Sequence, residues 1–286
     1  MKKKTIQDFN QMVANDEKIT YITAYDYLTA KYVERAGMDM ILVGDSLGMV
    51  QYGYENTFAV TMDDMIRHTA AVRRGAPNTF IVGDMPYMSY QPCDEDAIRN
   101  AGRFISEGKA DCIKLEGAGE LILSRIKAIN DAGVLVMGHI GLTPQFAGQL
   151  GGFKAQGRTG DAAVKLVKQA LAVEAAGACS MLIEGVPAIV GREIAKRVNI
   201  PALGIGAGSF THGQILICAD MLGMYDDFIP KFAKRYTNIG EQMQKAFEEY
   251  AKEIREVKFP NDAEHAYKIT DEESDKFMEL LEKEGI

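Results

Sequence analysis

Charged and hydroxyl side chains recur at one kind of position along the chain, at or just after the ends of short apolar runs. Asp and Glu offer hard oxygen ligands to a cation such as Mg²⁺, and Lys and His can hold an anionic substrate. A metal ion beside a carboxylate base is suited to removing a proton from carbon. The residues concerned are Asp45 and Ser46, Asp84, Lys114 and Glu116, His139, and Glu184.

Each of these residues also has an ordinary structural explanation. An Asp after a strand is more often a turn or helix cap than a ligand, and we interpret Asp26 in this way. A lone His139 in an apolar run is more often a hydrogen-bonded core residue, and Lys114 with Glu116 could form a structural ion pair. However, five consecutive predicted strands place an ionisable group at the same end. One shared site explains this pattern better than five separate structural causes.

The spacing within the pattern assigns provisional roles. Lys114 and Glu116 are two residues apart, so on a strand both point to one face, and Leu115 points to the other. Without a His or Cys cluster, the carboxylates Asp45, Asp84 and Glu116 favour Mg²⁺. Lys114 and His139 can then hold an anionic substrate, which leaves Glu184 as a candidate general base.

The elements that must position these residues follow an alternating rhythm of apolar runs and segments with helical spacing. Predicted strands are 19–26, 40–45, 80–86, 112–117, 134–141, 179–185, 200–208 and, more weakly, 214–220, which could be helical. Predicted helices are 27–37, 63–74, 94–108, 119–132, 161–177 and 188–198, and Asp63, Asp94 and Asp161 are predicted to cap three of them.

This alternation predicts an α/β fold, a (β/α)8 TIM barrel in a single domain with a C-terminal helical extension. A doubly wound open sheet is the alternative, but GIGAGSF has Ser209 where the dinucleotide-binding pattern needs its last glycine. We expect the barrel domain, with an amphipathic helix over 231–257, to span residues 1–267. Residues 268–286 then form an acidic helix or tail.

Composition excludes several classes of partner. The chain of 286 residues has a net charge of −8 and no evident basic face, which argues against nucleic acid. No apolar run reaches the length of a membrane helix. The four cysteines form no CxxC pair, so neither a zinc site nor a redox motif is predicted, and we expect a cytoplasmic protein.

Several motifs together resemble the ketopantoate hydroxymethyltransferase family, a member of the phosphoenolpyruvate/pyruvate barrels. The resemblance runs from about residue 3 to about residue 267, and GDSLGMV and GHIGLTPQ are its most specific motifs. The others are TMDDMIRHTAAV, GDMPYMSYQ, IKLEG, GFKAQGR, IPALGIGAG and IPKFAKRY.

The resemblance implies a reaction and a site. A hydroxymethyl group would pass from 5,10-methylenetetrahydrofolate to 3-methyl-2-oxobutanoate, giving 2-dehydropantoate for pantothenate and coenzyme A biosynthesis. Family members form large homo-oligomers, often decamers, so we expect a homo-oligomer here. The implied metal ligands for Mg²⁺ are Asp45, Asp84 and Glu116, the implied base is Glu184, and the implied substrate-binding residues are Asp45, Ser46, Asp84, Lys114 and His139.

Two departures from the family pattern, His212 and Ala219, put loop details and folate contacts in doubt but not the chemistry. The nearest alternative function is a Mg²⁺-dependent lyase or mutase that acts on a 2-oxo acid. A phosphate-binding barrel that uses GIGAGS and a non-catalytic 2-oxo acid binder are further alternatives. Glu184 argues against the last of these.

Overall fold

Eight parallel strands pair in sequence order, and β8 closes on β1 to complete a barrel. The predicted (β/α)8 barrel is therefore confirmed. This computed structural model describes residues 2–286. The strands are β1 Ile19–Thr23, β2 Met40–Val43, β3 Phe80–Asp84, β4 Cys112–Glu116, β5 Val136–Gly141, β6 Ser180–Glu184, β7 Ala202–Ile205 and β8 Gly213–Leu216.

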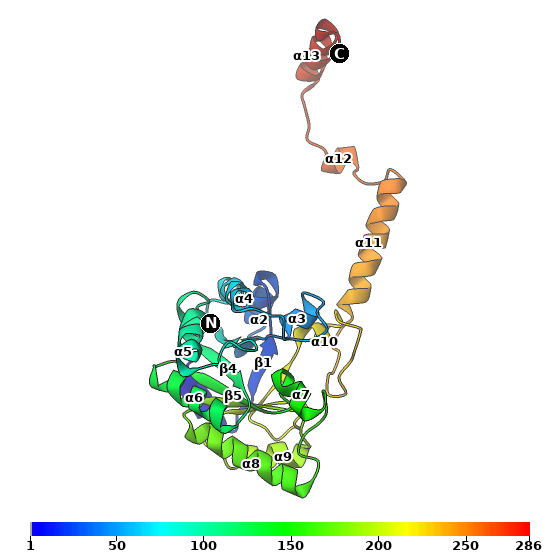
Figure 1. Cartoon of the computed structure of the whole chain (residues 1–286). Helices are drawn as coiled ribbons and strands as arrows, with labels where there is room; N and C mark the ends of the chain where they lie inside the picture. Colours follow the sequence, from blue (N-terminus) through cyan, green and yellow to red (C-terminus); the bar gives the residue numbers. More distant parts are fainter. Residues whose placement is uncertain (1) are drawn as a thin grey trace. The chain divides into compact units, whose positions relative to one another are not determined.

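Helices follow most of the strands and surround the barrel (Figure 1). The six longer ones are α2 Tyr27–Arg35, α4 Met62–Gly75, α5 Asp94–Ser106, α6 Glu120–Asp131, α8 Gly160–Ala175 and α9 Ala188–Ala195. Residues 206–212 connect β7 to β8 without a helix. Shorter elements are α1 Ile6–Ala14, α3 Leu47–Val50, the 3-10 turn η1 Pro144–Phe146, α7 Ala147–Leu150 and α10 Cys218–Leu222.

The helix starts differ from the prediction in one respect. Thr61, Cys93 and Thr159 are the N-caps of α4, α5 and α8, and each accepts a hydrogen bond from a backbone N–H of the first turn. Asp63, Asp94 and Asp161, which were predicted to be caps, lie inside the first turn, where their negative charge favours the helix dipole. Asp26 does cap α2, since its carboxylate accepts from the Thr29 N–H.

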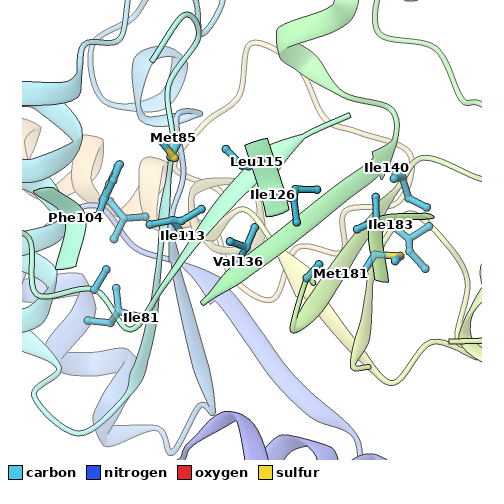
Figure 2. Close-up of a cluster of buried hydrophobic side chains, with 14 of the residues drawn as sticks. Ile81, Met85, Phe104, Ile113, Leu115, Ile126, Val136, Ile140, Met181 and Ile183 are labelled. Atoms are coloured by element: carbon cyan, nitrogen blue, oxygen red, sulfur yellow. The ribbon is translucent and has the colours of Figure 1, made fainter. Parts of the chain in front are cut away.

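Side chains alternate along each strand between two apolar layers. Outward residues pack against the helices, as Figure 2 shows for Ile113 and Leu115 on β4 and Val136 on β5. Inward residues such as Cys112 and Met137 fill the lower part of the barrel interior. Because β4 alternates in this way, Lys114 and Glu116 face the interior above Cys112, while Leu115 faces the helices.

The weakly predicted eighth strand, 214–220, contains part of a strand and the start of a helix. Only residues up to Leu216 belong to β8, and Cys218 begins α10. None of the helices within residues 2–286 has the length and the apolar character needed to cross a membrane.

Contacts within the chain divide it into two units, Met1–Thr237 and Asn238–Ile286. The second unit holds α11 Ile239–Arg255, α12 Asp262–His265 and α13 Asp271–Glu284. The predicted helix over 231–257 therefore starts later than expected. Its predicted apolar face is present on α11 and exposed, through Met243, Phe247, Tyr250 and Ile254. The division of the protein at residue 267 stays a prediction.

Candidate active site

The structure brings the predicted site residues together at the C-terminal end of the barrel. They come from five consecutive strands, β2 to β6. Asp45 and Ser46 follow β2 after Gly44, and Asp84 and Glu184 are the last residues of β3 and β6. The strand register sets Asp84 beside Lys114, and Glu116 beside His139. Ligands bind at this end of such barrels, so one shared site explains the pattern.

A continuous chain of charged contacts links four of these strands. Lys114 Nζ lies 2.8 Å from Asp84 Oδ1 and 3.3 Å from Glu116 Oε1. His139 Nδ1 is 3.3 Å from the same Glu116 oxygen, and His139 Nε2 is 3.2 Å from Glu184 Oε2. The imidazole of His139 therefore bridges two carboxylates, and Glu184 is the terminal group of the chain.

The second part of the site is built around Asp45. Its backbone N–H donates to Asp84 Oδ2 at 3.0 Å, which aligns the two acids side by side. Its carboxylate Oδ2 accepts from Gln145 Nε2, also at 3.0 Å. The neighbouring Ser46 hydroxyl is 2.9 Å from the Tyr25 hydroxyl. Asp45 is therefore held in place by both its main chain and its side chain.

Sequence reasoning gave no role to Tyr25, Tyr90 or Gln145, which support the site from three loops. Gln145 also donates its backbone N–H to Glu116 Oε2 at 2.9 Å. The buried Tyr90 hydroxyl donates to Gln145 Oε1 at 2.6 Å and accepts from the Glu116 N–H at 3.2 Å. Tyr90 and Gln145 stand in two of the quoted motifs, GDMPYMSYQ and GHIGLTPQ, which is the signal that marked them.

Burial controls the protonation of the acids. It raises the pKa of Asp45 well above its usual value, and the negative charges of Asp84 and Glu116 raise it further. The pKa of Asp84 is raised by burial too, although Lys114 opposes the shift. Burial acts in the same direction on Glu116, but the charges of Lys114 and His139 outweigh it and lower that pKa to about 2.

The two basic groups remain charged despite burial, because acids surround them. Burial lowers the pKa of Lys114, but Asp84, Glu116 and Asp45 outweigh this effect and raise it. Burial and Lys114 lower the pKa of His139, whereas Glu116 and Glu184 raise it to about 9. A protonated His139 attracts both carboxylates electrostatically, with Glu184 at 3.2 Å from Nε2.

The donor set suits a hard cation. Asp45 and Asp84 are adjacent, buried and raised in pKa, so a divalent cation would relieve an existing electrostatic cost. Within residues 2–286, no three His, Cys, Asp or Glu side chains are arranged to hold a metal ion by themselves. Mg²⁺ commonly takes one or two carboxylates and keeps its other positions for water and substrate. These residues therefore fit Mg²⁺ better than an ion that needs a protein cage.

The departures from the family pattern lie outside this cluster. His212 Nδ1 accepts from the N–H of Ala202, the first residue of β7, so the ring lies at the opposite end of the barrel. Ala219 is buried in α10. His212 is therefore placed away from any ligand that enters at the strand ends.

Comparisons with known proteins agree with this geometry. The family model for ketopantoate hydroxymethyltransferase matches residues 3–262. A 3-methyl-2-oxobutanoate hydroxymethyltransferase of Alkaliphilus metalliredigens is 55% identical over 282 residues, with 99% of each chain covered. One from Enterococcus faecalis is 52% identical over 270 residues, with 94% of this chain and 98% of the relative covered.

Solved structures of low sequence identity share the fold. Phosphonopyruvate hydrolase, crystallised with oxalate and Mg²⁺, superposes with a TM-score of 0.61 at 15% identity, and 99% of each chain is covered. The 2,3-dimethylmalate lyase, a member of the PEP mutase/isocitrate lyase superfamily, has a TM-score of 0.59 at 16% identity, with 98% of this chain and 96% of that chain covered.

Proposed function

Because the chain belongs to the ketopantoate hydroxymethyltransferase family and is therefore a one-carbon transferase of pantothenate biosynthesis, we propose that it enolises 3-methyl-2-oxobutanoate at C3 before carbon transfer. The enolate then attacks the one-carbon unit of 5,10-methylenetetrahydrofolate. A C–C bond forms, the donor's C–N bonds break, and water supplies the hydroxyl of 2-dehydropantoate.

Glu184 is the base that takes the C3 proton. The observation that carries this assignment is its place at the end of the charged chain, with Oε2 3.2 Å from His139 Nε2. Lys114 contacts both Asp84 and Glu116, and Asp45 lies beside Asp84, whereas Glu184 has His139 as its one charged neighbour among the site residues. Glu184 is also the least buried, since 16% of its side chain is exposed and can face a substrate. A base in this position typically contributes ~10²–10⁴-fold to the rate.

Other residues of the chain bind and orient the 2-oxo acid. Lys114 supplies a fixed positive charge at the centre of the site, and the Ser46 hydroxyl can donate to the substrate carboxylate. His139 positions Glu184 through its Nε2 and is anchored through its Nδ1 by Glu116. The tyrosine and glutamine contacts described above hold the carboxylates in place.

Mg²⁺ would be held by Asp45 and Asp84, with Glu116 as the third carboxylate of the group. When bound, the ion would supply positive charge beside the keto oxygen, which lowers the energy of the enolate. Both oxygens of Glu116 already have partners within the protein, Lys114 and His139 at Oε1 and the Gln145 N–H at Oε2. Its contribution would therefore be mainly electrostatic.

A substrate assay tests this function. Purified protein with Mg²⁺ and 3-methyl-2-oxobutanoate should form 2-dehydropantoate only when 5,10-methylenetetrahydrofolate is present. Chelation should abolish turnover, and added Mg²⁺ should restore it. Mg²⁺ should also raise the melting temperature of the wild type but not of Asp84→Asn. Product formed from the 2-oxo acid without a one-carbon donor would instead indicate a lyase or mutase.

The protein is further proposed to be a cytoplasmic homo-oligomer. Support comes from the resemblance and from an exposed apolar surface on α2, where Leu28 is 60% and Tyr32 is 64% exposed. Exposed aromatic and aliphatic residues on one helix are typical of subunit contacts. Sedimentation velocity would determine the number of subunits.

A further inference from the structure

Two aromatic side chains meet above the barrel although they come from different loops. Phe58 belongs to the loop that follows β2 and α3, and Tyr87 to the loop that follows β3. Their ring centroids are 4.9 Å apart and the rings are tilted by 53°. Phe58 is 42% exposed and Tyr87 is 40% exposed. Single exposed aromatics are common, but a contacting pair built from two loops requires both loop paths to be fixed.

Both loops begin at the proposed metal-binding carboxylates. The first starts at Asp45, and it returns to pack on Gly48, where a built Cβ would lie 2.6 Å from Val60 Cγ2. Thr57 and Val60 are buried on either side of Phe58, so they anchor the segment that carries the ring. Phe58 is therefore held at the C-terminal end of the barrel.

The second loop starts directly after Asp84. Ser89 donates its N–H to the Pro86 carbonyl at 3.1 Å, and Met88 has a positive φ of 64°, so residues 86–89 form a tight turn. Asn100 of α5 holds this turn by donating to the Ser89 carbonyl at 2.7 Å. One residue later, Tyr90 makes its buried contacts with Gln145 and Glu116. The turn thus presents Tyr87 outward within three residues of a group that contacts the site.

Two neighbouring aromatic residues, Tyr52 and Tyr54, hold the loop that carries Phe58. Tyr52 bonds through its hydroxyl to His68 Nε2 at 2.9 Å. The ring of Tyr54 contacts that of Tyr52, with centroids 5.4 Å apart. Its Cδ2 would lie 3.4 Å from a Cβ built on Gly48. These two rings fix the loop. Phe58 and Tyr87 instead contact each other, and within residues 2–286 the Tyr87 hydroxyl forms no hydrogen bond, so their exposed ring surfaces remain available to a ligand.

We propose that Phe58 and Tyr87 form the surface on which the flat rings of the folate donor stack. This inference rests on the proposed function and deepens it by locating the co-substrate. The donor must approach the enolate from the open end of the barrel, since the closed interior is filled with side chains. Planar heterocycles stack on exposed aromatic rings, and such contacts are typically lost on substitution with Ala. A second copy of the chain is the competing occupant.

The test compares Phe58→Ala and Tyr87→Ala with the wild type. Each should raise the KM for 5,10-methylenetetrahydrofolate by about tenfold, the effect expected from loss of one stacking contact. The KM for 3-methyl-2-oxobutanoate and the folate-independent exchange of its C3 proton in D2O should stay within about twofold of wild type. Tyr87→Phe, which keeps the ring, should retain the wild-type KM, and Tyr87→Leu, which keeps bulk without a ring, should not. Tyr267→Ala, at a fully exposed tyrosine that belongs neither to the site nor to the apolar surface of α2, is the matched control.

Three results would overturn the proposal. The first is an unchanged folate KM in both alanine variants. The second is an equal loss of C3 exchange and of folate use, which would give the pair a structural role. Tyr87→Leu separates this outcome from misfolding, because it keeps the bulk of the side chain and removes only the ring. The third is a changed sedimentation coefficient with normal folate kinetics, which would make the pair a subunit contact. Failure of the proposed function is distinguishable, because the wild type itself would then show neither exchange nor turnover.

Discussion

Among the single residues of the site, Lys114 offsets the negative charge of the carboxylates. Its ammonium group is buried and contacts both Asp84 and Glu116. Burying an ion is costly unless partners surround it, and removing one partner exposes the cost on the others. Lys114 is thus both a structural counterion and a candidate substrate-binding group.

Lys114→Ala should therefore affect stability and binding together. It leaves buried Asp84 without its cation and Glu116 with His139 alone, which should lower the free energy of unfolding by about 3–5 kcal/mol. The Kd for 3-methyl-2-oxobutanoate should rise at least about tenfold, because a charged hydrogen bond is lost. Urea denaturation and calorimetry measure the two effects. Lys127→Ala, which breaks an exposed pair with Asp131, is the control and should change neither. Unchanged affinity in a folded Lys114 variant would leave only the structural role.

Asp220 provides a pH-dependent prediction. Burial raises its pKa to about 6, although Arg235 opposes the shift. Between about pH 4 and pH 6 the folded state therefore holds a proton that the unfolded state has released, so the contribution of Asp220 to stability falls as pH rises. Asp220→Asn cannot ionise. It should match the wild type near pH 4 and exceed it by about 1–2 kcal/mol at pH 7.5, where solvent screening reduces the full effect.

The measurement for Asp220 is chemical denaturation of both proteins across this pH range. A difference in unfolding free energy that does not depend on pH would mean that Asp220 is charged throughout, and that its burial has no effect on ionisation.

At the scale of elements, the contact between β3 and α5 sets the position of Asp84. A Cβ on Gly83 would lie 2.3 Å from Cδ1 of Phe104, a side chain that is fully buried. Gly83→Ala should therefore force the helix and strand apart, lowering the unfolding free energy by about 1–3 kcal/mol. Gly102→Ala, on the same helix and facing open space, should raise it by about 0.5–1 kcal/mol. In thermal denaturation, the melting temperature should fall for Gly83→Ala and rise for Gly102→Ala. A shift in the same direction for both variants would show that Gly83 is not closely packed against Phe104.

The alternation of apolar runs and helical segments was sufficient to predict the barrel, because strands buried on both faces have a distinctive composition. The same rule placed Lys114 and Glu116 on the inner face, since side chains on a strand alternate. Tyr25, Tyr90 and Gln145 could not be assigned in this way. Their contacts depend on the paths of three separate loops, and loop paths leave no periodic signal in a sequence. The capping positions were also misjudged, because an acid fits both the cap and the first turn.

At the scale of the whole molecule, the two units differ in how they are stabilised. The barrel unit has extensive apolar layers inside and outside its strands. Helices α11 and α13 contain no buried residues. We therefore expect a chain that ends at Tyr267, and so lacks α13, to keep its barrel fold. Its melting temperature should change by less than about 2 °C, as for other losses of exposed side chains. A much larger drop in calorimetry would show that residues 268–286 contribute to the core or to a subunit contact.

In the proposed reaction, five strand ends form one site in which Glu184 removes a proton from C3. Wild-type protein with Mg²⁺ and 3-methyl-2-oxobutanoate in D2O should incorporate deuterium at C3 even without folate, as measured by NMR. Glu184→Gln keeps the size and hydrogen-bonding capacity of the side chain but is not an effective base. Exchange should fall by ~10²–10⁴-fold, whereas substrate binding should persist and the exposed control Glu120→Gln should be normal. Full exchange in Glu184→Gln would show that Glu184 is not the base and would move this role to another residue, with His139 as the next candidate.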